Sequence, residues 1–422
     1  MSGVTLPVLS TSLKNFQNIF KPMVPADIKF IDDVAITGKH ILLRVDFNVS
    51  LNPNNLTIAD DARIRQAIPT IQYLLKNKNK LIIVSHLGRP KGKPDPKFSM
   101  RIVSDHLQGY LPNFKVRLIN DFLTEDKATF DAQNANEIFL LENIRFYPGE
   151  KDNDPKFTKK LASLADVYVN DAFGVSHRAD ASVVGVTEYL PSYGGLLLKR
   201  EIDMISKATE HPEKPVVAII GGAKISTKIN VIDKLMKLAD YLIIGGALAN
   251  TFLYAQGIDV GSSFAEKDQA EEARKIMFKA AQKHTTIILP SDCIVGKPDE
   301  LEKGGSVCKV SEVPKDLQIL DIGPETKARI GTIIAKSKTI IWNGPVGYFE
   351  NIHYRQGTDF VYYVITENTE ATSVIGGGDT LAAISKKEYL EKITHISTGG
   401  GAMLEFIEKG TLPGIEALKH KG

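Results

Sequence analysis

The sequence has few of the features that would place this protein in a membrane or send it out of the cell. No stretch reaches the run of about 18 apolar residues that a bilayer-spanning helix needs. Residues 1–20 have neither the early basic cluster nor the unbroken apolar core of a signal peptide. We therefore expect a cytoplasmic protein with no membrane partner.

Cysteine is scarce, and so is excess charge of either sign. Cys293 and Cys308 are the two cysteines, and we expect both to be reduced packing residues, as is usual in a cytosolic protein. The 52 Lys and Arg nearly balance the 50 Asp and Glu, which leaves a net charge of +2. Such a balance gives no global field for nucleic acid, so any anion-binding site must be local.

Repeats, low-complexity tracts and the two most familiar phosphate-binding signatures are also missing. No stretch fits G-x-x-x-x-G-K-[ST], and none fits G-x-G-x-x-G after an apolar run. These absences argue against a repeat protein, a P-loop protein and a typical dinucleotide-binding protein.

What the sequence does have is a regular alternation of strand-like and helix-like segments. Its 422 residues exceed the usual size of one core, and 43% hydrophobic with 24% charged residues is typical of globular domains. Apolar residues three and four apart predict helices at 64–75, 157–165, 196–209, 232–238 and 269–282. Short apolar runs predict strands at 40–45, 81–85, 137–141, 167–169, 216–220, 241–244, 286–289, 339–342, 372–375 and 394–396. The alternation predicts an α/β fold, with two Rossmann-like domains whose parallel sheets are flanked by helices.

The domain boundary is predicted near residue 192. The glycine-containing stretch 193–195 and the helical pattern that follows it look like an interdomain connection. We expect an N-terminal extension at 1–25 with no readable role, a first domain at 26–192, an interdomain helix at 193–209 and a second domain at 210–396.

The predicted strands of the first half end in basic turns. If parallel strands align these turns along one edge, their cations meet in one place and require an anion there. Arginine binds phosphate and carboxylate through paired N–H groups, whereas Asp46 and Asn48 can accept from a hydroxyl. The implied ligand is a phosphorylated hydroxy acid, although each arginine alone could instead pair with a neighbouring carboxylate, and His86 could be a structural donor. The basic residues concerned are Arg63, His86, Arg89, Arg145 and Arg178.

The predicted strands of the second half end in turns of small residues. After 216–220 comes a glycine turn that we expect to open into a helix, with Lys224 and Lys228 four apart on one face. Further turns lie at 245–247, 343–345 and 376–380, and together they indicate a nucleotide site. Asp379 could hold Mg²⁺ on the nucleotide phosphates, or could simply cap a helix, just as the lysines could simply be solvated.

Eight motifs, taken in order, resemble the phosphoglycerate kinase family from about residue 26 to the end. They are RVDFN (44–48), SHLGRP (85–90), LLENIRF (140–146), NDAFGVSHRADAS (170–182), GGAKIS (221–226), WNGPVGYFE (342–350), GGGDT (376–380) and HISTGGGAMLEF (395–406). The resemblance implies reversible phosphoryl transfer between ATP and 3-phosphoglycerate with Mg²⁺, by a hinge-bending monomer. It also implies a hinge near 397–399 and a C-terminal segment, 397–422, that returns to the first domain.

The resemblance also implies roles for individual residues. Arg63, Lys224 and Lys228 would be catalytic, Asp379 would be associated with magnesium, and Glu350 would contact the ribose. The implied 3-phosphoglycerate contacts are Asp46, Phe47, Asn48, Arg63, His86, Leu87, Gly88, Arg89, Arg145 and Arg178. The implied nucleotide contacts are Gly222, Ala223, Lys224, Lys228, Gly245, Gly246, Asn343, Pro345, Glu350, Gly377, Gly378, Asp379 and Thr380.

Three positions depart from the commonest pattern of the family. Ser50 replaces a proline, Asp180 a histidine and Met403 a serine, and Asp180 adds negative charge near Arg178 that could weaken substrate binding. Two other hypotheses are a phosphotransferase for a different acid and a catalytically silent nucleotide-binding protein. The silent protein should lack Arg63, Lys228 or Asp379, yet all three are present.

Overall fold

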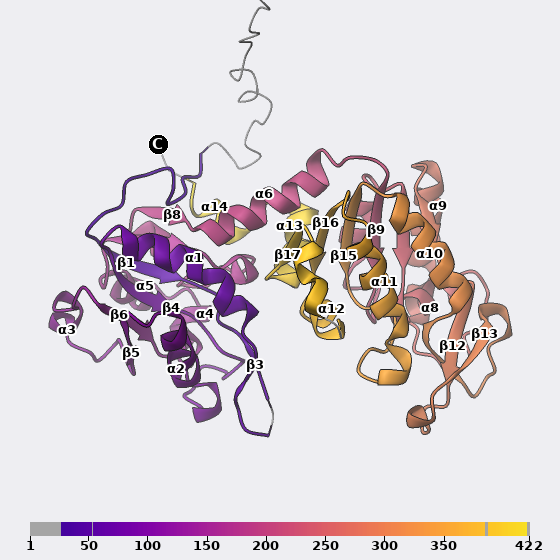
Figure 1. Ribbon diagram of the computed structural model, residues 1–422, viewed down its shortest axis with the longest axis horizontal. Helices are drawn as coiled ribbons and strands as arrows, with labels where there is room; N and C mark the ends of the chain where they lie inside the picture. The colour runs from indigo at the N-terminus through magenta and orange to yellow at the C-terminus, as the bar shows by residue number, and fades with distance from the viewer. Residues whose placement is uncertain (1–26, 53, 385–386, 420–422) are drawn as a thin grey trace, which may run out of the picture.

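Two parallel sheets, each flanked by helices, form the two lobes of the molecule (Figure 1). The computed structural model describes residues 27–52, 54–384 and 387–419, so the predicted extension at 1–25 lies outside the described residues. Among the residues described, no helix is long and apolar enough to cross a bilayer.

The first sheet belongs to the N-terminal lobe. Its strands, in spatial order, are β5 (Lys115–Ile119), β6 (Glu137–Leu141), β4 (Lys80–Val84), β1 (His40–Arg44), β7 (Val167–Asn170) and β8 (Ser192–Gly194). The other elements of this lobe are β2 (Ser50–Leu51), β3 (Ile58–Asp60), α1 (Ala62–Lys76), α2 (Arg101–Tyr110), α3 (Lys127–Asp131), α4 (Pro148–Lys151) and α5 (Pro155–Ala162). All neighbouring strands of the sheet run parallel, as predicted.

The second sheet has the same all-parallel pairing. Its strands, in spatial order, are β11 (Thr286–Ile288), β10 (Tyr241–Ile244), β9 (Val216–Ile220), β15 (Thr339–Asn343), β16 (Thr372–Gly376) and β17 (His395–Ser397). The helices of this lobe are α7 (Ile229–Leu235), α8 (Gly246–Ala255), α9 (Ala270–Gln282), α10 (Pro324–Lys336), α11 (Gln356–Glu367) and α12 (Gly378–Ala383).

An antiparallel sheet extends the second lobe, and the sequence predicts one of its strands, in the alternating run 306–310. It consists of β13 (Ser306–Lys309), β12 (Asp292–Gly296) and β14 (Gln318–Ile322), in that spatial order. In Figure 1, β12 and β13 lie at the end of the molecule that is farthest from the N-terminal lobe.

The central strands are buried on both faces, which explains their unbroken apolar runs. Ile41 and Leu43 of β1 pack in one apolar cluster, whereas Leu42 between them faces another. Every residue of β9 is 0% exposed. In α1, Ile64, Ala67, Ile71 and Leu74 form the buried face, at spacings of three and four residues.

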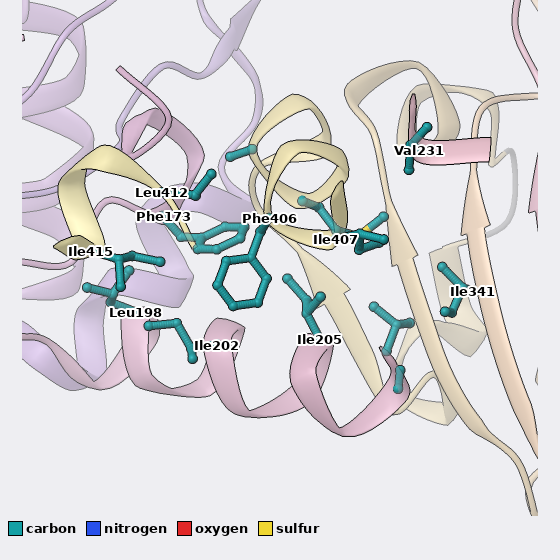
Figure 2. Packing of buried hydrophobic residues seen from close by; sticks show 14 of the residues in the cluster. Phe173, Leu198, Ile202, Ile205, Val231, Ile341, Phe406, Ile407, Leu412 and Ile415 are labelled. Atoms are coloured by element: carbon teal, nitrogen blue, oxygen red, sulfur yellow. The ribbon is translucent and has the colours of Figure 1, made fainter. Parts of the chain in front are cut away.

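One apolar cluster extends from the first sheet to the second. It contains Leu42 of β1 and Ile341 of β15, and α6 (Leu196–Glu210) lies along it. Figure 2 shows Leu198, Ile202 and Ile205 of α6 facing side chains of the C-terminal segment. That segment consists of α13 (Gly400–Lys409) and α14 (Pro413–Glu416).

The C-terminal segment reaches back to the first lobe. Gly414 N donates to Ser176 O at 2.8 Å, and Asn170 Nδ2 donates to Gly414 O at 3.2 Å. Ile28 near the start of the described chain forms an isolated β-bridge with Lys419. The chain therefore crosses between the lobes twice, once through α6 and once after β17 (Figure 1).

We predict that Phe406→Ala lowers the free energy of unfolding by about 3 to 5 kcal/mol, the usual cost of removing a buried phenylalanine ring. Phe406 is 5% exposed, and its ring centre lies 6.0 Å from that of Phe173 in an edge-to-face contact. Urea denaturation followed by circular dichroism measures the change. Tyr363→Ala is the control because Tyr363 is 53% exposed. A loss below about 1 kcal/mol in Phe406→Ala would contradict the prediction.

Candidate active site

The basic residues predicted in the first half meet at one edge of the first sheet. Asp46 and Asn48 follow β1, His86 follows β4, Arg145 follows β6, and Arg178 follows β7. Because these strands run parallel, their carboxyl ends share one edge, where open α/β sheets bind ligands.

Asp46 lies at the centre of this group and is 8% exposed. Arg63 Nε lies 3.8 Å from Asp46 Oδ2, and His86 Nδ1 lies 3.7 Å from Asp46 Oδ1. Burial raises the pKa of Asp46, but the charges of Arg63 and Arg44 and a hydrogen bond from the Asn48 amide outweigh burial and hold it below its ordinary value. Asp46 is therefore an ionised acceptor at neutral pH.

His86 is neutral at the same pH. It is 2% exposed, and burial lowers its pKa well below the ordinary value, with further lowering by Arg145 and Arg44. Its Nδ1 lies 3.5 Å from Arg44 Nη2. A neutral imidazole beside several arginines can give a hydrogen bond to a ligand without adding another positive charge.

Arg145 and Arg178 have hydrogen-bond donors with no protein acceptor. Arg145 is 6% exposed; its Nη1 donates to Gly88 O at 3.0 Å, whereas its Nε and Nη2 have no partner among the described residues. The same holds for Arg178 Nε. Burial and the charge of Arg178 lower the pKa of Arg145 to about 10, so it remains charged. Buried charged donors without partners are costly, and an anion would satisfy them.

Arg63 lies in the first turn of α1 and links three parts of the chain. Its guanidinium donates to Asn48 O through Nη1 and to Thr398 O, 3.1 Å away, through Nη2. Thr398 N and Oγ1 in turn donate to Glu201 Oε1 of α6, at 2.6 and 2.7 Å. Glu201 Oε2 lies 2.7 Å from Nε2 of His395 in β17. These contacts tie Arg63 to both connections between the lobes.

The remaining predicted substrate contacts differ in exposure. Arg89 is exposed, whereas the side chains of Phe47 and Leu87 are buried in the core, so they could contact a ligand only through the backbone. Gly88 has φ +63°, and a Cβ there would lie 2.3 Å from the Phe98 ring. Its amide donates to Asn48 Oδ1 at 2.8 Å, which fixes the Asn48 side chain.

A buried polar network below these residues was missed in the sequence analysis. Arg44 Nε donates to Ser182 Oγ at 2.9 Å, and Ser182 Oγ donates to Glu150 Oε1 at 2.6 Å. Ser182 N also donates to Glu150 Oε2 at 2.9 Å. Arg44 and Glu150 are both 0% exposed. The network holds Arg44 against His86. The sequence did not predict this role, because an arginine at the end of a strand is not specific for a buried network.

The small-residue turns of the second half pack backbone against backbone. Gly222 N donates to Pro345 O at 3.0 Å, and Gly246 N donates to Val346 O at 2.9 Å. A Cβ at Gly221 would lie 2.0 Å from Pro345 O, and one at Gly246 would lie 2.7 Å from Gly222 O. Only glycine allows these turns to approach so closely.

The predicted helix carrying Lys224 and Lys228 on one face is wrong. Helix α7 begins at Ile229, and Lys228 is its N-cap residue. Lys224 is exposed, whereas Lys228 is partly buried and its Nζ donates to Asn343 Oδ1 at 3.0 Å. Burial lowers the pKa of Lys228, and the charge of Asp379 opposes that effect. The turn stays irregular because the glycines preceding the lysines pack on residues 343–346.

Two adjoining pockets lie over these turns, with Gly222, Ala223, Pro345 and Asp379 lining both. One, of about 410 Å³, has apolar walls that include Phe264 and Leu320, and Glu350 also lines it. The other, of about 350 Å³, contains both lysines and the turn at 377–380. Of the predicted nucleotide contacts, Gly245 alone lines neither pocket. Together the two pockets have the size and lining to hold a nucleotide, with its base in the apolar pocket and its phosphates beside the lysines. Phe264 and Leu320 were not among the predicted contacts.

Asp379 fits magnesium held mainly by phosphate oxygens. It is exposed in the first turn of α12, next to the pocket that contains the lysines, and it is not the N-cap residue, which is Gly377. No cluster of three or more His, Cys, Asp or Glu side chains suited to a metal is found in the described residues. Magnesium bound to nucleotide needs no such cluster, because one carboxylate can complete its phosphate and water ligands.

Two lobes, an edge of unsatisfied cations and a pocket lined by lysines are typical of a two-domain α/β phosphotransferase. The family model described as phosphoglycerate kinase matches residues 31–410. Phosphoglycerate kinase from Moorella thermoacetica is 46% identical over 392 residues, covering 93% of this chain and 99% of the relative. The relative from Acidobacterium capsulatum is 45% identical over 399 residues, with the same coverage.

Solved structures agree with the sequence comparison. The structure of phosphoglycerate kinase from Coxiella burnetii has a TM-score of 0.81 and 40% identity, and covers 93% of this chain and 98% of its own. That from Pyrococcus horikoshii has a TM-score of 0.79 and 30% identity, with the same coverage. The chain belongs to the phosphoglycerate kinase family. The predicted fold class, family and kinase activity are confirmed, and the catalytically silent alternative is not favoured.

We predict that Glu150→Gln makes the protein more stable, relative to wild type, as the pH rises. Burial raises the pKa of Glu150 from 4.5 to about 7, and the Arg44 charge only partly offsets this. The folded state therefore binds a proton more tightly than the unfolded chain does. This stabilisation is complete below pH 4.5 and is lost as the pH rises through 7. Glutamine resembles the protonated acid but does not ionise, so the variant does not lose this stabilisation as the pH rises.

Urea denaturation of both proteins at pH 5 and pH 8 measures this effect. The unfolding free energy of Glu150→Gln, relative to that of wild type, should increase by about 2 to 3 kcal/mol from pH 5 to pH 8. Glu188→Gln, at an exposed position, is the control and should show no such change. Equal pH dependence of Glu150→Gln and wild type would contradict a proton on Glu150.

Proposed function

We propose that this enzyme catalyses reversible, magnesium-dependent phosphoryl transfer between ATP and the carboxylate of 3-phosphoglycerate, forming ADP and 1,3-bisphosphoglycerate. The observation that carries the proposal is the set of buried guanidinium donors on Arg145 and Arg178 without protein acceptors in the described chain. A ligand with several anionic oxygens would satisfy them. The names of the relatives support the same substrate.

In this proposal the first lobe binds 3-phosphoglycerate. Arg89, Arg145 and Arg178 bind its phosphate, because arginine can contact phosphate through two N–H groups. Asp46 and Asn48 accept from its hydroxyl group, and neutral His86 donates to it. The backbone of Phe47, Leu87 and Gly88 shapes the rest of the site.

The second lobe binds the nucleotide. The base and ribose occupy the pocket beside Leu320 and Glu350, and the phosphates lie in the adjoining pocket with Lys224 and Lys228. Close backbone approach to the nucleotide is possible at the small-residue turns. The proposed contacts there are Gly222, Ala223, Gly245, Gly246, Asn343, Pro345, Gly377, Gly378 and Thr380.

The substrate carboxylate is the nucleophile, and it is already ionised at neutral pH, so the mechanism needs no general base. The protein must hold donor and acceptor in line and neutralise the charge on the transferring group. Arg63, Lys224 and Lys228 supply that positive charge. Magnesium, when bound beside Asp379, would neutralise further phosphate charge.

Domain closure is part of the proposal, because the two substrates bind on different lobes. Closure would exclude the water that could otherwise intercept the phosphoryl group. Arg63 is suited to respond to closure, since it contacts Thr398 O in the connection that follows β17. The proposed domain limits stay those of the sequence analysis, with the hinge at 397–399.

We predict that Arg63→Ala lowers kcat by roughly a hundredfold or more, the usual cost of removing one contact to transition-state charge. A coupled assay of 1,3-bisphosphoglycerate formation from ATP measures the rate. Arg63→Lys is the matched variant, because it retains the positive charge but not the paired donors. Its kcat should lie between those of wild type and Arg63→Ala. Binding of ADP should be unchanged in both, which shows that the variants are folded. An unchanged kcat in Arg63→Ala removes Arg63 from the mechanism.

We predict that Asp379→Asn weakens binding of ADP by about tenfold when magnesium is present. Without magnesium, ADP should bind the variant at least as tightly as wild type, because the carboxylate that repels the phosphates is gone. Calorimetry with and without Mg²⁺ separates the two effects. Equal weakening under both conditions would mean that Asp379 does not hold the metal.

A further inference from the structure

The two cysteines of the chain lie opposite each other in the antiparallel sheet of the second lobe. Cys293 on β12 is the direct register partner of Cys308 on β13. Both are free thiols, and their sulfur atoms are 3.7 Å apart. From the sequence we expected both to be reduced packing residues, because a separation of 15 positions does not reveal that they face each other across two strands.

The backbone at this position is suited to a disulfide. Directly opposed residues of antiparallel strands have Cα atoms about 4.5 to 5.5 Å apart. Disulfides join residues whose Cα atoms are about 4.4 to 6.8 Å apart, with an S–S bond of about 2.05 Å. The two sulfurs therefore need rotation and a small approach of the side chains, but no change of strand register.

The two thiols differ in access to solvent. Cys293 is 0% exposed, and burial together with the neighbouring Cys308 raises the pKa of its thiol. Cys308 is half-buried, so a small oxidant in solution can reach it first. One accessible thiol next to one protected thiol is the usual arrangement of a reactive cysteine and the cysteine that resolves it.

We propose that Cys293 and Cys308 form a reversible intramolecular disulfide when the enzyme meets hydrogen peroxide. The Cys308 thiolate attacks one peroxide oxygen, which breaks the O–O bond, forms a sulfenic acid and releases one water molecule after protonation. The Cys293 sulfur then attacks the Cys308 sulfur and displaces hydroxide, which leaves as a second water with the thiol proton. Two thiols are thus oxidised to a disulfide while one peroxide is reduced to two waters.

This disulfide would act on the pocket that we assign to the nucleotide base, and that consequence rests on the proposed function. Strand β12 pairs on its other side with β14, where Ile322 is the partner of Cys293. Ile319, Leu320, Asp321 and Ile322 of β14 line the pocket, as does Leu301 between β12 and β13. A disulfide would fix β12 to β13 through the turned side chains, so this wall would lose the freedom to adjust to the nucleotide and nucleotide binding would weaken.

Formation of the disulfide is tested on the full-length protein with hydrogen peroxide. Free thiols are then blocked in denaturant, and the protein is analysed by mass spectrometry. Wild type should lose both thiols and two hydrogen atoms, dithiothreitol should restore them, and digestion should yield one cross-linked peptide pair. Retention of two free thiols, or only disulfides between molecules, overturns the proposal.

Two variants separate the proposed roles of the cysteines. In Cys293→Ser, dimedone should trap a sulfenic acid on Cys308, because the resolving thiol is missing. In Cys308→Ser, Cys293 should stay reduced, because it is buried. Faster oxidation of Cys293 than of Cys308 in these variants contradicts the proposed order of attack.

ADP binding, measured by calorimetry before and after oxidation, tests the effect on the pocket. The dissociation constant should rise about threefold or more in wild type, recover on reduction, and stay constant in Cys308→Ser. A cross-link with unchanged ADP binding overturns the effect on the pocket and leaves the modification site in place. An inactive enzyme that still forms the cross-link would count against the proposed function alone.

Discussion

The continuous apolar cluster along α6 is the contact on which the arrangement of the two lobes depends. Side chains from one face of each sheet contribute to it, and α13 and α14 complete it between them (Figure 2). Each sheet alone would expose part of this apolar surface to water. Burial of that surface therefore stabilises the two lobes only when they are packed together. The residues that we propose for ligand binding stand on sheet edges whose relative position depends on this cluster. In the proposed domain closure, the lobes would therefore rotate about this packed contact and would not move freely on a linker.

Charge is distributed between the lobes in a way that suits a transfer reaction. The first lobe holds arginines near the carboxylates of Asp46 and Asp180, and the second holds Lys228, whose charge lies near that of Asp379. In the proposed function, each substrate would bring negative charge to one of these two sets of cations. The buried network of Arg44, Ser182 and Glu150 adds rigidity under the first set, because a satisfied polar network fixes side-chain positions.

Much of the fold, but less of the site, could be predicted from the sequence. Fully buried strands such as β9 were found because burial on both faces demands a continuous apolar run. Strand β5 was missed because it is an edge strand that carries Lys115 and Arg117, and β8 because its Tyr193 and Gly194 looked like part of a connection. The course of residues 221–228 is set by contacts with residues 343–346, more than a hundred positions away, so local spacing wrongly predicted a helix. The contact of Arg63 with Thr398 uses a backbone carbonyl, which leaves no trace in residue type.

The return of the C-terminal segment to the first lobe has a consequence for the way the chain is made. Leu412, Ile415 and Leu418 are buried at 1%, 0% and 1% exposure against a lobe that is otherwise built from the first half of the sequence. Synthesis on the ribosome proceeds from the N-terminus, so the first lobe emerges early and waits with an apolar surface uncovered until the last residues appear. The second lobe, by contrast, has all its strands once β17 has emerged. The half of the protein that is translated first is thus the half that is finished last.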